Sequence, residues 1–396
     1  MRTFHKTKRP TVGAGRVIGT RNGQSPVREE PLEQETANRR CGKGHWNKKR
    51  PIAGAGRVIG TRNGQSSVRE GSLEQETANR QSGIRHQETD VPVNGGIRKN
   101  MVFTGYLFVH FIGEQKDGEQ IYFSLSRDGL HWEDLMGGRP VLRSGIGEGG
   151  ARDPFIIRTP GRFYLIATDL RIEAGKGWEA AQYGGSRDIL VWESEDLVNW
   201  EGPAARTIGV EGAGCVWAPE AIYDEERDAV LVFWASMVEQ KQKIYASYTT
   251  DFASFTEPVV FLEKENHVID STIIRTEQGY YRYTKDETVK TICIDFSKTL
   301  HLEDFTEIRS SVLEGLYGVE GPEIFRFNDR NEWCLMVDRF AAGKGYLPLV
   351  TDCLDDGSFR ILEDNEFDMG ASKKRHGGIM PITEDEYRTL LARYGG

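Results

Sequence analysis

The sequence is poor in cysteine and contains no long apolar run. Its five cysteines among 396 residues stand at unpatterned positions without a Cys-x-x-Cys pair, which argues against a disulfide framework and against a cysteine-held metal centre. No stretch reaches the roughly eighteen apolar residues of a membrane helix, and the first residues lack the apolar core of an export signal. We therefore expect a cytoplasmic protein with no membrane partner.

Positive charge is scarce after residue 100. Residues 1–100 contain 20 Lys and Arg against 9 Asp and Glu, whereas residues 101–396 contain 31 against 51. A basic arm could bind nucleic acid, but this one consists largely of two near copies, 8–39 and 49–80, without strand or helix periodicity. We expect the extension 1–100 to be disordered, with no nucleic-acid partner, and the working protein to be a single domain, 101–396.

The part after residue 100 contains a repeat of a strand opening. Five times an acidic residue or His opens a short apolar strand, at separations of 67, 50, 50 and 56 residues. The five opening residues are Asp153, Glu220, Asp270, Glu320 and His376. A period of this size with several short strands per unit is typical of a β-propeller, in which equivalent positions face one axis. The sequence thus predicts an all-β, five-bladed propeller with five ionisable side chains on its axis.

The order of the strands predicts how the ring closes. Further apolar runs and a polar turn that ends in an aromatic residue follow the first four openings, whereas only a short tail follows His376. Residues 106–111, residues 120–125 and the turn that ends at Trp132 supply the missing strands. The N-terminal strands are therefore expected to complete the blade whose inner strand is C-terminal, which removes free sheet edges.

Acids clustered on one axis need an explanation. They repel one another, and carboxylates whose pKa values are pushed apart are what acid/base hydrolysis requires. Each acid alone has an ordinary explanation, because Asp-Pro and Glu-Gly-Pro also occur at turns and strand entries. Three acids in matching phase favour a catalytic site.

At Asp153-Pro, Trp217-Ala-Pro, Ile-Asp270 and Glu320-Gly-Pro the chain resembles glycoside hydrolase family 43, five-bladed hydrolases that remove arabinose or xylose units from plant polysaccharides. The resemblance covers residues 104–386. It implies that Asp153 is the general base, that Glu320 is the general acid, and that Asp270 orients the substrate and raises the pKa of the acid. It also implies inversion at the anomeric carbon, which needs room for a water between acid and base.

Five more residues keep two interpretations each. Glu220 binds a sugar hydroxyl or braces the ring, Trp217 and Trp178 wall the pocket or pack in the core, and Arg339 binds a hydroxyl or, as we favour, pairs locally. His376 resembles the axial histidine that lies near calcium in some relatives. One imidazole without an oxygen cage is a poor calcium site, so we favour a satisfied channel histidine over a single structural calcium ion. The chemistry requires no cofactor.

These observations predict an exo-acting glycosidase for oligosaccharides. The loop 173–186 is long enough to close one side of the mouth, which favours a pocket and the release of terminal α-L-arabinofuranosyl units. β-Xylosidase and β-galactofuranosidase activities stay open. A second class is a sugar-binding propeller without turnover, although such a protein has no use for both an acid and a base. The sequence leaves the sugar, the linkage and the oligomeric state open.

Overall fold

The computed structural model describes residues 89–90, 100–301 and 304–396, all within one unit, Arg69–Gly396. The duplicated segments, and with them the expected disorder of the extension, lie outside the described residues. Two short strands, β1 (Thr89–Asp90) and β2 (Asn100–Met101), pair antiparallel ahead of the main fold.

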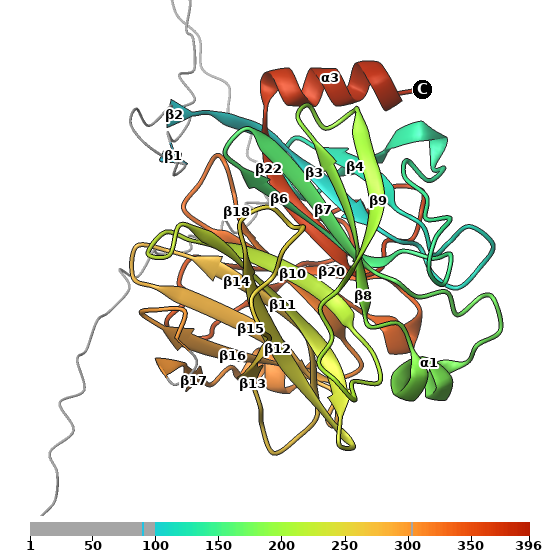
Figure 1. The fold of residues 1–396 in the computed structure, drawn as a ribbon. Helices are drawn as coiled ribbons and strands as arrows, with labels where there is room; N and C mark the ends of the chain where they lie inside the picture. The colour runs from blue at the N-terminus through green and yellow to red at the C-terminus, as the bar shows by residue number, and fades with distance from the viewer. Residues whose placement is uncertain (1–88, 91–99, 302–303) are drawn as a thin grey trace, which may run out of the picture. The chain divides into compact units, whose positions relative to one another are not determined.

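Five four-stranded antiparallel sheets form a five-bladed β-propeller (Figure 1). Blade 1 contains β6 (Arg152–Thr159), β7 (Arg162–Thr168), β8 (Asp188–Ser194) and β9 (Trp200–Thr207). Blade 2 contains β10 (Trp217–Asp224), β11 (Ala229–Val238), β12 (Lys241–Thr249) and β13 (Val259–Leu262). Blade 3 contains β14 (Val268–Arg275), β15 (Tyr280–Asp286), β16 (Thr291–Ser297) and β17 (Thr306–Ile308). Blade 4 contains β18 (Glu320–Arg326), β19 (Trp333–Asp338), β20 (Tyr346–Thr351) and β21 (Arg360–Ile361).

Blade 5 closes the ring with strands from both ends of the domain. Its order is β22 (Gly377–Thr383), β3 (Phe103–His110), β4 (Tyr122–Ser126) and β5 (Trp132–Asp134), with Ile379 opposite Phe108 (Figure 1). Each inner strand contacts the next around the axis, in the order β22, β6, β10, β14, β18 and back to β22. The predicted five blades and their closure are confirmed.

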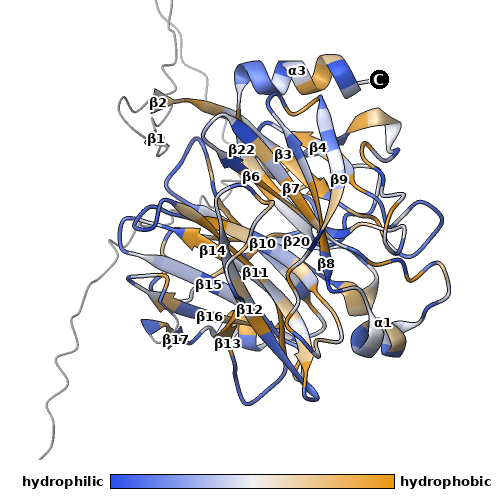
Figure 2. Cartoon of the chain, in the orientation of Figure 1, coloured by the Kyte–Doolittle hydropathy of each residue, from blue (hydrophilic) through white to orange (hydrophobic). Residues whose placement is uncertain are grey.

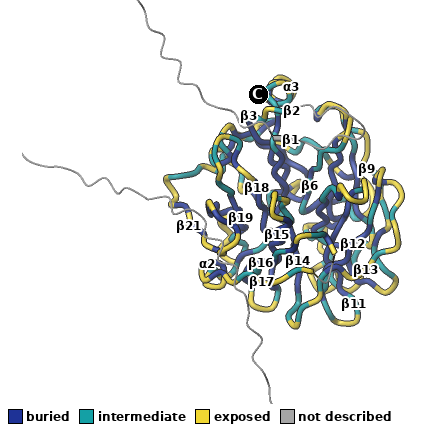
Figure 3. The backbone as a smooth tube through the Cα atoms, turned by 90° about the vertical axis from the view of Figure 1, so that its left-hand side faces the viewer, coloured by how far each residue is buried: buried dark blue, intermediate teal, exposed yellow. Residues whose placement is uncertain are grey.

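The hydrophobic core lies between neighbouring blades. Strand centres are apolar and buried, whereas connecting turns are polar and exposed (Figures 2 and 3). Five apolar clusters each contain one of the turn aromatics that end the repeat units: Trp132, Trp200, Phe255, Phe305 and Phe359. These rings pack between sheets, where large apolar area contributes most to stability. The prediction that they belong to the core is confirmed.

Helices are short and peripheral. They are η1 (Leu135–Gly137), α1 (Trp178–Gly184), α2 (Ser311–Glu314), η3 (Phe340–Ala342) and α3 (Glu384–Tyr394). α3 begins with a capping box between Thr383 and Glu386, which satisfies two free N–H groups. It buries Leu390 against β3 and β22, at the closure of the ring (Figure 1). Within the described part of the chain, no helix combines the length and apolarity needed to cross a bilayer.

A shared bulge shapes the inner strands of blades 1 to 4. Near the start of each strand the register shifts at one residue whose backbone is left-handed. The four residues are Asp153 (φ 47°), Ala218 (φ 47°), Asp270 (φ 48°) and Gly321 (φ 51°). Such a conformation costs a non-glycine residue on the order of 1–3 kcal/mol and is concentrated at functional sites. Four blades thus repeat one left-handed turn, and three of them place it on a strained, non-glycine residue.

The sequence suggested that the opening residues occupy equivalent positions on the inner strands. Their places relative to the bulge show that they do not. Asp153 and Asp270 occupy the left-handed position itself, Glu320 precedes it by one residue, and Glu220 follows it by two. The strand openings are therefore not equivalent in register, even though the chain brings several of them together. The structural equivalent of Glu220 in blade 4 is Glu323, because each follows a left-handed residue and a proline.

Candidate active site

Three carboxylates converge on one imidazole at the start of the fifth inner strand. His376 is 4% exposed. Its Nδ1 lies 3.6 Å from Asp153 Oδ1 and 3.9 Å from Asp270 Oδ2, and its Nε2 lies 3.8 Å from Glu220 Oε1. Burial lowers the pKa of His376, but the charges of these three acids outweigh burial and raise it to about 10. The structure thus brings three of the predicted axial acids around the imidazolium of a fourth predicted residue, His376.

Asp153 is positioned by a threonine from the neighbouring strand of its own blade. Thr168 Oγ1 donates a hydrogen bond to Asp153 Oδ2 at 3.0 Å and accepts one from the Ala218 N–H at 2.8 Å. One hydroxyl therefore links the left-handed residues of blades 1 and 2. Asp153 keeps part of its surface exposed, so a water molecule can approach the carboxylate.

Asp270 is more deeply buried than Asp153. The N–H of Gly321, the left-handed residue of blade 4, donates to Asp270 Oδ2 at 3.1 Å. Burial raises the pKa of Asp270 to about 6, although the positive charges of His376 and Lys285 oppose it. Asp270 can therefore carry a proton at mildly acidic pH.

Glu320 is bound by two cations. Lys285 Nζ donates to its Oε2 at 2.7 Å, and Arg375 Nη2 donates to its Oε1 at 2.8 Å. Burial raises the pKa of Glu320, but Lys285 and then Arg375 outweigh burial, and the pKa lies below its usual value. The two cations thus dominate the pKa of Glu320 in the free site, and the role of Asp270 in raising it stays a prediction.

Two glutamates lie buried on the axis. Glu220 is 3% and Glu323 is 2% exposed. The Ile379 N–H donates to Glu323 Oε1 at 2.6 Å, and Thr272 Oγ1 donates to its Oε2 at 3.4 Å. Burial raises the pKa of Glu220 to about 7, and burial together with the charge of Glu220 raises that of Glu323 well above its usual value.

Sequence reasoning missed Glu323 and both cations. The signal for Glu323 was present, because Pro-Glu follows both Ala218 and Gly321, and an alignment on the two prolines pairs the glutamates. Lys285 lies on the second strand of blade 3 and Arg375 precedes His376. Their contact with Glu320 depends on how three blades meet, which no local pattern encodes.

Aromatic side chains line the mouth beside blades 1 and 2. The Trp178 and Trp217 rings meet edge to face at 6.1 Å, and the Arg152 guanidinium lies 5.0 Å from the Trp178 ring centre. Arg152 also pairs with Glu114 and Glu119, each at 2.8 Å. Trp178 is 50% exposed, which argues against core packing, and its place in a pocket wall stays a prediction.

Arg339 bonds within its own loop. Its Nε donates to the Gly345 carbonyl and its Nη2 to the Tyr346 carbonyl, both at 3.2 Å. Burial lowers its pKa. These bonds support local pairing over a contact with a sugar hydroxyl, the alternative kept for Arg339 on sequence grounds.

The residues around His376 do not suit calcium. That ion takes six to eight oxygen ligands, and an imidazolium offers no free electron pair. Among the described residues no group of three or more His, Cys, Asp or Glu is arranged to hold a metal ion. The positive charge of His376 instead neutralises the acids around it, so we derive no chemical step through a metal.

One curated protein is similar in sequence to this chain. A curated α-L-arabinofuranosidase of Bifidobacterium longum is 31% identical over 290 aligned residues, which cover 60% of this chain and 27% of that protein. The chain thus spans about a quarter of that relative's length.

Solved structures of glycoside hydrolases also share similarity with the chain. A thermostable family-43 glycoside hydrolase is 19% identical, covering 56% of this chain and 74% of its own, with a TM-score of 0.41. The catalytic domain of the Coprinopsis cinerea GH62 α-L-arabinofuranosidase is 14% identical, covering 55% and 70%, with a TM-score of 0.41. We draw nothing about the substrate from these two.

The family model described as a probable glycosyl hydrolase domain, related to family 43, matches residues 102–388. This range contains all five blades and every residue of the site described above. The chain therefore belongs to the family-43-related glycosyl hydrolases.

Proposed function

We propose that this glycoside hydrolase releases terminal α-L-arabinofuranosyl residues from oligosaccharides with inversion of configuration. The observation that carries the proposal is the convergence of Asp153, Asp270 and Glu220 on His376, with Glu320 beside Lys285 and Arg375. Clustered carboxylates with different pKa values are the arrangement that acid/base hydrolysis uses. The arabinofuranosidase activity of the Bifidobacterium relative supports this sugar over xylose and galactofuranose.

Asp153 acts as the general base in this proposal. It takes a proton from a water molecule, and the water oxygen attacks the anomeric carbon. The bond from that carbon to the glycosidic oxygen breaks, and Glu320 donates a proton to the departing oxygen. Inversion requires about 6.5–9.5 Å between the two carboxyl groups. Asp153 and Glu320 come from blades 1 and 4, with blade 5 between them, which is consistent with such a gap.

The proton on Glu320 depends on its two cations. Burial favours the protonated acid, whereas Lys285 and Arg375 favour the carboxylate. A sugar hydroxyl that displaces either cation from Glu320 leaves the effect of burial less opposed, so substrate binding raises the pKa of the acid. Asp270, whose own pKa lies at about 6, adds negative charge and orients the sugar.

The leaving group separates the two roles experimentally. On 2,4-dinitrophenyl arabinofuranoside, whose leaving group needs no proton, Glu320→Gln keeps most of its activity, whereas Asp153→Ala loses about 10²–10⁴-fold. On an arabino-oligosaccharide both variants lose activity to that extent. Proton NMR of the first product, recorded before mutarotation, shows the β-anomer if the reaction inverts.

Several results would reject parts of the proposal. Retained α-configuration rules out inversion, and full activity of Asp153→Ala rules out its role as base. Equal losses of Glu320→Gln on both substrates rule out its role as acid. Xylosides and galactofuranosides in the same assay test the sugar, because turnover of either in place of arabinofuranoside rejects the assigned specificity and leaves the mechanism intact.

A further inference from the structure

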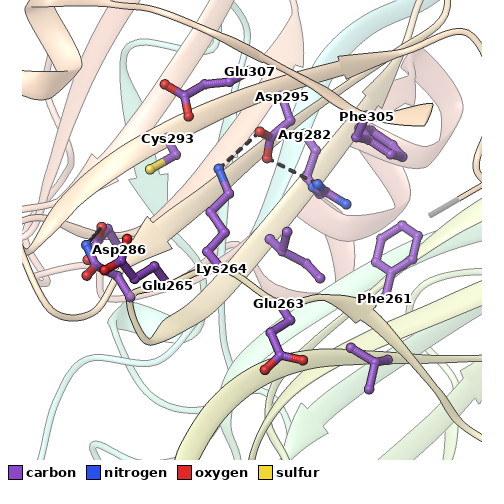
Figure 4. Close-up of a pocket in the computed structure, with 13 residues that line it drawn as sticks. Phe261, Glu263, Lys264, Glu265, Arg282, Asp286, Cys293, Asp295, Phe305 and Glu307 are labelled. Carbon is purple, nitrogen blue, oxygen red and sulfur yellow. Dashed lines mark hydrogen bonds and ion pairs between the residues drawn. The ribbon is translucent and has the colours of Figure 1, made fainter. Parts of the chain in front are cut away.

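A cavity lies between blades 2 and 3 (Figure 4), and its lining contains none of the axial carboxylates described above. Its volume is about 670 Å³, which falls within the usual range for ligand pockets, roughly 300–1,000 Å³. One wall comes from β13 and the residues after it, up to Asn266, and the other from β15, β16 and β17. None of these residues takes part in the proposed hydrolysis.

Arg282 marks this cavity as more than a packing defect. The side chain is 2% exposed, and its Nη2 donates to Asp295 Oδ2 at 3.1 Å. Its Nε and Nη1 are buried and have no hydrogen-bond partner. A buried donor without an acceptor costs about 1–3 kcal/mol, and burial lowers the pKa of Arg282. The two unpaired donors thus belong to a residue of the cavity wall, and a ligand oxygen that reaches them would satisfy them.

Charge in the lining argues against an anionic ligand. Five carboxylates stand against two cations, Lys264 and Arg282. Both cations already pair with Asp295, Lys264 Nζ lying 3.0 Å from its Oδ1 (Figure 4). An added anion would meet net negative charge, whereas neutral hydroxyl groups can donate to carboxylates and accept from the guanidinium.

Aromatic rings complete a sugar-like environment at one end. The Arg282 guanidinium lies 4.0 Å from the Phe305 ring centre and 5.3 Å from that of Phe261. Phe261 is 4% exposed, so the partly exposed Phe305 is the ring that can contact the C–H groups of a saccharide, while carboxylates accept hydrogen bonds from its hydroxyls. At another edge of the cavity lies Asp286, next in sequence to Lys285, which contacts Glu320. One residue of the cavity lining is therefore the sequence neighbour of Lys285, the cation that contacts the proposed acid Glu320.

We propose that this cavity, lined by Arg282, Phe261, Phe305, Asp295 and Glu307, binds a neutral saccharide unit. The sugar unit bound in the cavity belongs to the oligosaccharide that is being hydrolysed or to a second oligosaccharide molecule. It is not the terminal unit that is released. The inference goes beyond the proposed function, because it requires only that the protein meets carbohydrate and holds for any terminal sugar.

Cys293 provides a probe for occupancy. It lines the cavity and is half-buried, whereas Cys215 and Cys334 are buried. The test is maleimide labelling of Cys293 in full-length Asp153→Ala, followed by peptide mass spectrometry, with arabino-oligosaccharide, xylo-oligosaccharide or oligogalacturonate added. A neutral oligosaccharide at roughly four times its Kd slows labelling about fivefold, since only the free protein reacts. Oligogalacturonate has no effect.

Two neighbouring exposed residues of β17 form a matched pair of variants. Glu307 lines the cavity, and Thr306 points to the opposite face of the strand. Glu307→Ala raises the Kd of the oligosaccharide on the order of tenfold, as expected for one hydrogen bond to a charged group. The same oligosaccharide concentration then slows labelling only about 1.4-fold, whereas Thr306→Ala keeps the fivefold protection. Because both residues are exposed, both variants fold.

Three outcomes would overturn the proposal: no protection by any neutral saccharide, protection by oligogalacturonate alone, or equal effects of the two β17 variants. None of them depends on turnover. Hydrolysis of the aryl arabinofuranoside by the wild-type enzyme, measured separately, reports on the proposed function alone.

Discussion

Glu320 and Glu220 lie on inner strands of the same ring and are both largely buried, yet their pKa values move in opposite directions. Burial raises the pKa of Glu220 to about 7, because His376 and a hydrogen bond from Thr272 oppose burial only in part. At Glu320, Lys285 and Arg375 contact the two carboxylate oxygens and lower the pKa. The difference teaches that nearby cations, more than depth in the channel, decide which axial acid is charged.

Replacing each glutamate with glutamine should give the largest difference in activity between the two positions. On an arabino-oligosaccharide, Glu320→Gln lowers kcat/KM by about 10²–10⁴-fold, since the leaving oxygen loses its acid. Glu220→Gln lowers it by less than about tenfold, because the amide mimics the neutral acid that burial already favours. Steady-state kinetics near pH 6 measure both. Equal losses would show that the two acids share one role.

Stability as a function of pH should give the second largest effect. The pKa of Glu220 is about 7 in the fold against 4.5 for an ordinary glutamate, so the folded protein binds the extra proton between these values. Stability relative to Glu220→Gln therefore falls as pH rises from about 4.5 to 7, by about 3 kcal/mol, and is constant above. Urea unfolding at a series of pH values measures it.

Glu320→Gln serves as the control of opposite sign. In the folded protein the pKa of Glu320 lies below 4.5, the value of an ordinary glutamate. The free energy of unfolding of the wild type relative to Glu320→Gln therefore decreases only as pH falls below 4.5, towards the folded pKa. A decline above pH 4.5 for this pair, or none for Glu220→Gln, would contradict the assignment of charge in the channel.

Removing one cation should move the pH profile by a smaller amount. In Lys285→Met, Arg375 and His376 still oppose burial, but the largest opposing charge is gone and the pKa of Glu320 rises. The alkaline limb of kcat/KM then shifts upward by about one pH unit, the size of one close charge. Lys290 also pairs with Glu287 but does not contact Glu320. Lys290→Met should leave the limb in place, and a similar shift in both variants would exclude a specific effect on the acid.

The fold was predictable because the sequence repeats it. Four units contain the same run of strands and a closing aromatic turn, and the lone fifth opening at His376 required partners from the N-terminal strands. Hydrophobic periodicity and turn residues are local signals, so a single sequence displays them.

The electrostatics of the site were not predictable in the same way. Asp153, Asp270 and Glu320 could be named, but the charge on Glu320 depends on Lys285 from the second strand of another blade. The register was misjudged because the bulge inserts a residue before Glu220 but not before Glu320. Long-range contacts and single-residue bulges leave no periodic trace in the sequence.

The smallest predicted effect concerns Ala218, the left-handed residue in the bulge two positions before Glu220. Ala218 adopts φ 47°, which strains an alanine by about 1–2 kcal/mol, whereas glycine adopts it freely at an unfolded-state entropy cost of about 0.4–1 kcal/mol. Ala218→Gly should therefore stabilise the protein by about 0.5–1 kcal/mol in urea unfolding. Ala221 on the same strand lacks this conformation, so Ala221→Gly should destabilise by a similar amount. If both variants lose stability, the bulge is not strained at Ala218, and Asp153 and Asp270 then need no strain to face the imidazolium.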